Sequence, residues 1–126
     1  RYRLLGINIV QGYGLTETSP VVAIGTNKEH KIGSIGKTVP SVKAKLVDIN
    51  KEGVGELVVK GPSIALGYYN NEKATKESFK GDWFYTGDLA KIDKEGYIFI
   101  CGSIYFCSIH LHNYYIRVTQ NCRLLF

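Results

Sequence analysis

The sequence is poor in several residue types, and each shortage narrows the choice of protein class. Its 126 residues contain no methionine, one tryptophan and three prolines. Because the chain also opens on Arg1 without an initiator, we expect it to be a fragment of a longer protein. No apolar run approaches the roughly 18 residues of a membrane-spanning helix, and the apolar stretch near the start is too brief for a signal peptide. The sequence therefore predicts neither a transmembrane segment nor a secretory leader.

Cysteine is scarce as well, and its three copies cannot all pair with one another. This count argues against the disulfide framework of a small secreted domain, so we expect a cytoplasmic protein. Basic residues outnumber acidic ones by 16 to 11, but the lysines are interspersed with acids instead of clustering. That pattern is typical of a solvated surface and predicts no nucleic-acid partner.

The composition changes abruptly near residue 102. Residues 101–126 contain no acid and no lysine, yet they hold all three cysteines and two of the three histidines. The whole chain has the 44% hydrophobic and 21% charged content of a globular protein, so wholesale disorder is not expected. The break separates two kinds of sequence within one short chain.

The hydrophobic pattern predicts mostly strands. Residues 4–10 are apolar and rich in β-branched types, which indicates a buried strand followed by a glycine turn. Residues 42–46 alternate apolar side chains with lysines, and residues 56–61 are expected to return as the second strand of a hairpin. Asn71 is a good N-cap for a helix over 72–79, and a second hairpin is expected further along, at residues 89–92 and 97–101.

The first candidate site is the turn after the predicted strand, Tyr13-Gly14-Leu15-Thr16-Glu17. Gly14 allows a backbone N–H to approach a ligand closely. The Thr16 hydroxyl can bond a phosphate oxygen, and the Glu17 carboxylate is a hard ligand suited to Mg²⁺. No Gly-Lys-Ser/Thr follows, so this is not a Walker loop. The alternative is an ordinary polar turn.

The second candidate site is the turn Tyr85-Thr86-Gly87-Asp88. An aspartate held after a glycine turn can accept hydrogen bonds from two vicinal hydroxyls, as carboxylates do with a ribose. The alternative is a solvent-facing turn aspartate before a strand.

Taken in order, these segments resemble the adenylate-forming ligase superfamily, and within it the long-chain fatty acyl-CoA synthetases. The similarity covers nearly all of residues 1–102 with the spacing of that family. It rests on the segments QGYGLTETSP (11–20), GSIGKTVP (33–40), GELVVKGPSIALGYYN (55–70), WFYTGDL (83–89) and DKEGYIFICG (93–102).

The resemblance implies an α+β, β-rich fold that is an incomplete domain. Residues 1–30 would be the end of an α/β nucleotide-binding subdomain, and residues 31–102 most of a small β-barrel-like subdomain. It also implies a two-step reaction, in which a fatty acid and ATP give an acyl-adenylate and pyrophosphate, and coenzyme A then releases AMP. ATP, Mg²⁺, coenzyme A and a small carboxylate are the implied partners, and peripheral contact with a membrane stays open.

The resemblance also assigns roles to residues of the two turns. Tyr13 would pack its ring on the adenine, and Gly14 would permit close approach of the nucleotide. Thr16 would hydrogen-bond the α-phosphate, and Glu17 would help to hold Mg²⁺. Asp88 would bind the ribose 2′ and 3′ hydroxyls. These are positioning and electrostatic roles.

The sequence departs from the family pattern at Ser103, where the family has an arginine that reaches the ribose. Residues 103–126 carry no family pattern, and our hypothesis is that a frameshift or a sequencing error replaced the true continuation. The sequence also has no counterpart of the Ser/Thr/Gly-rich loop that wraps the β- and γ-phosphates, nor of the domain that carries the adenylating lysine. We therefore expect no turnover by this polypeptide alone.

Three alternatives stay open at this level. One is an amino-acid-activating domain of a peptide synthetase, and another is a non-catalytic β-rich interaction module with a basic surface. The third concerns the tail, whose zinc-compatible residues lack the usual ligand spacing. Those residues are Cys101, Cys107, His110, His112 and Cys122.

Overall fold

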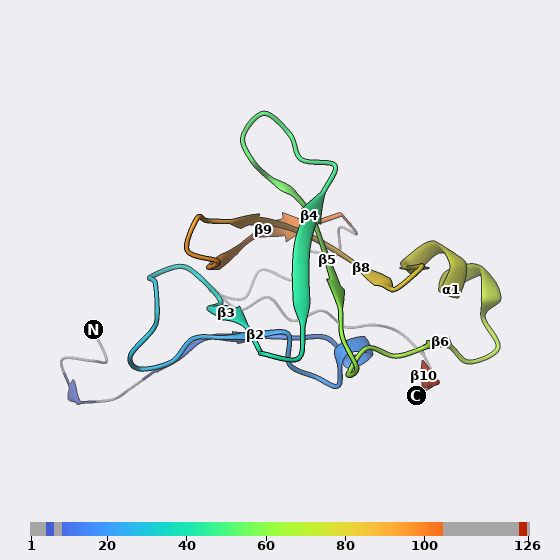
Figure 1. Ribbon diagram of the computed structural model, residues 1–126, viewed down its shortest axis with the longest axis horizontal. Helices are drawn as coiled ribbons and strands as arrows, with labels where there is room; N and C mark the ends of the chain where they lie inside the picture. The colour runs from blue at the N-terminus through green and yellow to red at the C-terminus, as the bar shows by residue number, and fades with distance from the viewer. Residues whose placement is uncertain (1–4, 7–8, 105–123, 126) are drawn as a thin grey trace.

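The computed structural model describes residues 5–6, 9–104 and 124–125. Two antiparallel sheets dominate it, a small one below and a larger curled one above (Figure 1). The small sheet joins β1 (Gly12–Tyr13), β2 (Ala23–Ile24) and β3 (Lys37–Thr38) in that order. The predicted α+β, β-rich fold with a barrel-like part is confirmed, because the larger sheet curls into a half-barrel over the small one.

The larger sheet contains the two hairpins that the sequence predicts. Its strands are β4 (Lys43–Val47), β5 (Gly55–Lys60), β7 (Phe79–Lys80), β8 (Trp83–Ile92) and β9 (Ile98–Ser103). The first hairpin pairs β4 with β5 and the second pairs β8 with β9. Lys43 and Lys45 are exposed while Val42 is buried, as the alternation predicts.

The helix α1 (Glu72–Ser78) begins where the sequence predicts it. The Asn71 side chain accepts a hydrogen bond from the Ala74 N–H at 3.0 Å, which caps the first turn. The helix ends one residue earlier than expected, because Phe79 has an extended backbone and starts β7. Residues 85–88, expected to be a turn, are instead part of the long strand β8.

The expected buried strand at residues 4–10 is not found where the chain is described. Leu5 lies in a turn and is 73% exposed, and Ile9 and Val10 are also exposed and outside any strand. A strand is buried only when neighbouring elements cover both its faces, and no described element covers these residues. Residues 4, 7 and 8 lie outside the described part.

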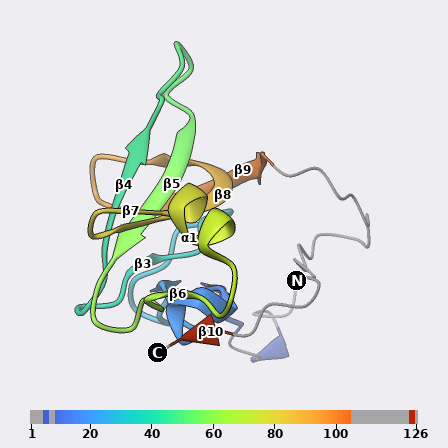
Figure 2. The same cartoon turned by 90° about the vertical axis from the view of Figure 1, so that its right-hand side faces the viewer.

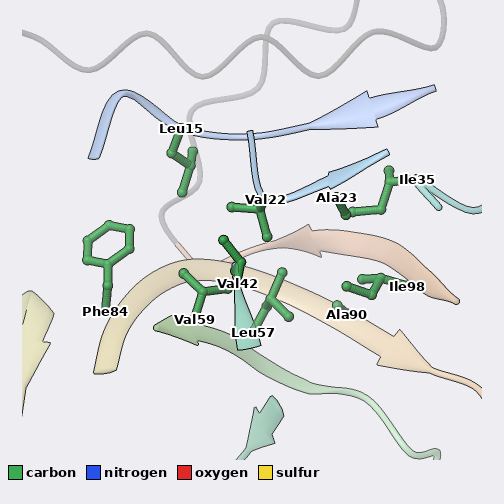
Figure 3. Close-up of a cluster of buried hydrophobic side chains, with 10 residues drawn as sticks. All are labelled: Leu15, Val22, Ala23, Ile35, Val42, Leu57, Val59, Phe84, Ala90 and Ile98. Carbon is green, nitrogen blue, oxygen red and sulfur yellow. The ribbon is translucent and has the colours of Figure 1, made fainter. Parts of the chain in front are cut away.

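The core lies between the two sheets and is shared by both. Leu15, Val22 and Ala23 come from the first part of the chain and meet Leu57 and Phe84 of the larger sheet (Figure 3). All five are at most 8% exposed. A backbone hydrogen bond also ties the segment before β3 to the larger sheet, since Ile35 N–H donates to the Ile98 carbonyl at 2.9 Å. The predicted boundary at residue 30 stays a prediction.

Two short strands lie beside the small sheet. Strand β6 (Gly67–Tyr68) pairs with β10 (Leu124–Leu125), so these two tail residues add a strand at the edge of β6. Figure 1 and Figure 2 both place β6 next to the blue turn that follows β1. The rest of the tail between residues 105 and 123 lies outside the described residues, and the frameshift hypothesis stays untested.

Candidate functional site

The first turn is stabilised by the side chain of Thr18. Residues Thr16–Thr18 form a 3₁₀ turn, η2. The Thr18 hydroxyl is buried; it accepts a hydrogen bond from the Leu15 N–H at 2.9 Å and donates to the Leu15 carbonyl at 2.8 Å. These bonds hold the turn against the core through Leu15 and leave Thr16 exposed at its start. Thr18 did not stand out in the sequence, because a buried hydroxyl that closes its own turn has no distinct pattern.

Gly14 is required by the fold of the turn itself. A Cβ at this position would lie 1.5 Å from the Pro20 carbonyl oxygen and 2.6 Å from the Pro20 carbonyl carbon. Both contacts are with backbone atoms, which cannot rotate away. Gly14 therefore allows the backbone at the start of the turn to lie in close contact with the backbone of Pro20. The expected approach of a nucleotide to Gly14 stays a prediction.

Glu17 is a carboxylate that is buried in the described part of the chain. It is 2% exposed, although carboxylates are rarely buried without a partner. The Tyr68 hydroxyl donates a hydrogen bond to its Oε1 at 2.8 Å. Its Oε2 is also buried and has no hydrogen-bond partner. A buried carboxylate oxygen without a partner is costly, so this atom is suited to accept a cation or a donor.

The second turn is a bulge in the middle of the larger sheet. Glu56 pairs with Leu89 and Val58 pairs with Tyr85, so residues 86–88 of β8 stand opposite Leu57 alone. Extra residues in one strand bend it and redirect its side chains. The bulge lies directly before and at Asp88, which is buried like Phe84 and Ala90 of the same strand.

The bulge is held by three hydrogen bonds. The buried Thr86 hydroxyl donates to the Leu57 carbonyl at 2.7 Å and accepts from the Asp88 N–H at 3.1 Å. The Gly87 N–H donates to Glu56 Oε1 at 3.0 Å, and Gly87 has a φ of +71°, which favours glycine. Thr86 and Glu56 thus support Asp88, which is 8% exposed. Glu56 lies 31 positions before Gly87, in another strand, and could not be connected with this turn from the sequence.

The two turns meet through Tyr13 and Asp88. The Tyr13 hydroxyl donates to Asp88 Oδ2 at 2.6 Å, across 75 positions of the chain. Tyr13 is half-buried and leads directly into the turn that carries Thr16 and Glu17. The structure thus brings the two candidate segments into direct contact. Whether the Tyr13 ring also packs on a base stays a prediction.

Ser103, where the resemblance expects an arginine, lies beside the second turn. It pairs with Asp88 in the register of β8 and β9. Its hydroxyl donates to the Gly87 carbonyl at 3.1 Å. The strand pairing therefore continues one residue past Gly102. The short serine side chain binds the bulge backbone in the place where a long side chain was expected.

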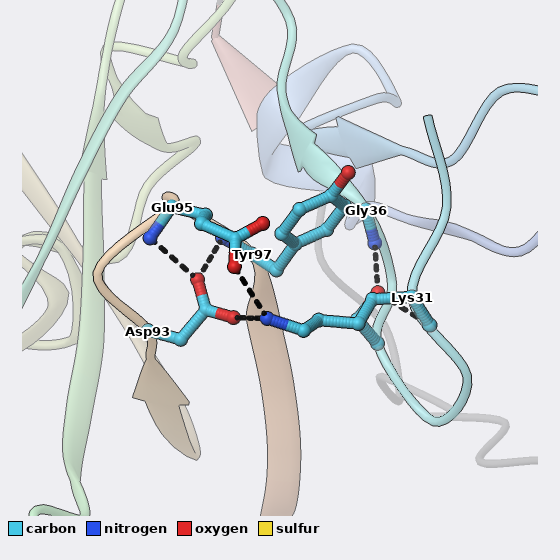
Figure 4. A network of polar contacts seen from close by, with 6 residues as sticks. Lys31, Gly36, Asp93, Glu95 and Tyr97 are labelled. Carbon is cyan, nitrogen blue, oxygen red and sulfur yellow. Dashed lines mark hydrogen bonds and ion pairs between the residues drawn. The ribbon is translucent and has the colours of Figure 1, made fainter. Parts of the chain in front are cut away.

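A second polar network lies at the far end of the β8–β9 hairpin (Figure 4). Lys31 Nζ contacts Asp93 Oδ2 at 2.6 Å and Glu95 Oε1 at 3.1 Å. Its hydrogen bond to Asp93 raises the pKa of Lys31 above its ordinary value of 10.5 and lowers that of Asp93 below 3.8. Lys31 and Lys37 also lie over the Tyr97 ring, at 5.3 and 4.8 Å from its centroid. The network fastens the loop before β3 to the hairpin.

The described residues also form a hollow of about 530 Å³. It lies between the start of β4, the end of β5 and the β7–β8 turn. None of the expected site residues lines it. Its lining includes Lys43, Lys60, Ile64, Leu66, Phe79 and Asp82.

A metal cage made of protein side chains alone is not seen in the described part. No group of three or more His, Cys, Asp or Glu residues gathers there. Of the zinc-compatible tail residues only Cys101 is described, and it is exposed and unpaired. Cys107, His110, His112 and Cys122 lie outside the described residues. A single carboxylate such as Glu17 is nevertheless enough for Mg²⁺ when substrate phosphates supply the other ligands.

Among the described residues, no helix is long and apolar enough to span a bilayer.

Comparison with known proteins connects this geometry with a family. Residues 1–69 match the family described as AMP-binding enzyme. The protein named long-chain-fatty-acid–CoA ligase FadD15 of Mycobacterium bovis is 45% identical over 101 residues, which cover 80% of this chain and 16% of that protein. The long-chain-fatty-acid–CoA ligase of Escherichia coli O6:H1 is 44% identical over 102 residues, covering 76% of this chain and 18% of that protein.

A solved structure has the same fold. O-succinylbenzoate coenzyme A synthetase (MenE) from Bacillus subtilis, in complex with ATP and magnesium ion, superposes with a TM-score of 0.72 at 34% identity. The match covers 78% of this chain and 22% of that one. The chain spans less than a fifth of the length of the curated relatives it matches.

Proposed function

The chain belongs to the AMP-binding enzyme family, and from that premise we propose that its two joined turns are part of the adenylate site of an AMP-forming fatty acid–CoA ligase. The observation that carries the proposal is the hydrogen bond between Tyr13 and Asp88. It brings the first turn, which carries the Thr16 hydroxyl and the buried Glu17 carboxylate, against the second turn, which carries the Asp88 carboxylate. A nucleotide needs both, one for its phosphates and one for its ribose.

The reaction proposed for the whole protein has two steps. A fatty acid carboxylate oxygen attacks the α-phosphorus of ATP, the bond to pyrophosphate breaks, and an acyl-adenylate forms. The sulfur of coenzyme A then attacks the acyl carbonyl, the bond to AMP breaks, and the thiol proton is lost. Both steps need the adenylate to be held while bonds change, which is the work of positioning and charge stabilisation.

The residues of the turns divide that work. Asp88 would accept hydrogen bonds from the ribose hydroxyls after exchanging the Tyr13 hydroxyl for them. Thr16 is exposed at the start of its turn, where its hydroxyl can donate to an α-phosphate oxygen. The ring of Tyr13 would stack on the base, and Gly14 would keep the backbone close to it. These assignments follow from the resemblance and are supported by the contact between the turns.

Glu17 fits the Mg²⁺ that such a reaction uses. Its Oε2 is buried and without a partner, and oxygen is the ligand that Mg²⁺ prefers. Bound there, Mg²⁺ would neutralise phosphate charge. The match to a synthetase solved with ATP and magnesium ion supports this choice of metal.

The fatty acyl branch is favoured over the peptide synthetase branch by the named relatives, both long-chain-fatty-acid–CoA ligases. A fatty acid as substrate and coenzyme A as co-substrate are part of the proposal. The exposed, unpaired thiol of Cys101 supports a reducing compartment, so we propose the cytoplasm as its location.

Binding of AMP to the full 126-residue chain tests the proposal. We expect weak binding in isothermal titration calorimetry, and we expect Asp88→Ala to lower the affinity at least about tenfold because two charge-assisted hydrogen bonds are lost. Glu56→Gln, which keeps an acceptor for the Gly87 N–H, is the matched control. Equal affinities for the wild type and Asp88→Ala would refute the ribose role.

A further inference from the structure

Tyr68 has no part in the function proposed above, yet it fixes the direction of the Glu17 carboxylate. Its hydroxyl donates to Glu17 Oε1 at 2.8 Å, across 51 positions of the chain. A carboxylate is planar, so holding one oxygen also determines where the other one lies. The oxygen left over, Oε2, is the buried atom without a hydrogen-bond partner.

Tyr68 is itself held on several sides. Its N–H donates to the Thr75 hydroxyl of α1 at 2.9 Å. The preceding Gly67 lies so close to α1 that a Cβ there would be 2.7 Å from Thr75 Cγ2. The Tyr68 ring meets the Phe79 ring edge-on, with centroids 5.6 Å apart and planes at 74°. A side chain fixed in this way can impose an orientation on a neighbour.

We propose that Tyr68 is a positioning residue that turns Oε2 of Glu17 toward the Mg²⁺ of the bound nucleotide. The inference rests on the proposed function, because Glu17 is a metal ligand only within it. Groups that orient a metal-ligating carboxylate change metal affinity by about 10–100-fold when removed. Without the Tyr68 hydroxyl, the carboxylate could rotate and both its oxygens would lack a partner.

The test measures Mn²⁺, a paramagnetic substitute for Mg²⁺, by electron paramagnetic resonance on the full chain with ATP present. Tyr68→Phe is expected to weaken Mn²⁺ binding about tenfold and to leave AMP affinity without metal unchanged. Tyr69→Phe is the matched control, since the neighbouring side chain is 49% exposed. In the background of Glu17→Gln, adding Tyr68→Phe is expected to cause no further loss.

A further control distinguishes a lost orientation of the Glu17 carboxylate from a general loss of protein stability. Replacing Tyr68 by 3-fluorotyrosine keeps the ring and the donor, so this protein is expected to bind Mn²⁺ like the wild type. The inference is overturned if Tyr68→Phe binds Mn²⁺ as tightly as the wild type, or if it causes a further loss in the Glu17→Gln background. If the wild type binds AMP but no Mn²⁺ with ATP, the metal role of Glu17 fails and this inference fails with it. If the wild type binds neither, the proposed function itself is refuted.

Discussion

The bond between Tyr13 and Asp88 is predicted to be a measurable source of stability in the absence of any ligand. Tyr13→Phe removes one hydroxyl that donates to a carboxylate at 2.6 Å. A hydrogen bond to a charged group contributes about 1.5–3 kcal/mol, and the half-buried tyrosine favours the lower part of that range. We expect the free energy of unfolding to fall by about 1.5–2 kcal/mol, which lowers Tm by about 5–8 °C in a chain of this size.

A double-mutant cycle isolates this bond from other effects of the substitutions. Tyr13→Phe, Asp88→Ala and the double variant are compared by urea unfolding of the full chain, and a coupling energy of about 1.5 kcal/mol is expected. Tyr85→Phe is the control, because the Tyr85 ring contacts Lys80, with Nζ 4.2 Å from the ring centroid. A coupling energy below about 0.5 kcal/mol would refute the claim that this bond joins the two turns.

Three further outcomes are expected. Gly14→Ala places a methyl group 1.5 Å from the Pro20 carbonyl oxygen, so thermal denaturation is expected to show a free energy of unfolding lowered by more than about 2 kcal/mol. Gly102→Ala is the control and is expected to show no such loss, because a Cβ at Gly102 meets open space. Lys31 lowers the pKa of Asp93 in the folded protein. The ion pair therefore stabilises the fold above pH 3.8, the pKa of Asp93 in the unfolded chain, and this stabilisation is lost as the pH falls through the lower pKa of the folded state. Because the pKa of Lys31 is raised, the stabilisation is also fully present up to pH 10.5. The difference in Tm between the wild type and Asp93→Asn is thus expected to be constant from about pH 5 to 9 and to vanish in stronger acid, and a difference that persists there would contradict this. Finally, the chain is expected to release no pyrophosphate from ATP with Mg²⁺ and a fatty acid, and robust turnover in a coupled assay would show that these residues suffice for the first step.

The sequence alone predicted those elements whose signals are local. The alternation at 42–46, the turn residues of both hairpins and the N-cap Asn71 all act over a few positions, and each predicted element was found. The strand expected at 4–10 was wrong in its described residues, because an apolar run is buried only if other elements cover it. A local sequence pattern does not show whether other elements cover the run.

The candidate site residues could be named from the sequence, but the residues that hold them in place could not. Tyr13, Glu17 and Asp88 lie in recognisable motifs, and the structure joins Tyr13 to Asp88. Tyr68 and Glu56 act from strands far along the chain, through contacts that only the folded sheet creates. Their side chains carry no local signal of a role.

The central claim is that both turns hold one adenylate, and amide chemical shifts test it most directly. AMP titrated into the ¹⁵N-labelled full chain is predicted to shift the amides of Gly14–Glu17 and of Gly87–Asp88 together, with a single dissociation constant. Shifts confined to one turn, or two different dissociation constants, would contradict the claim.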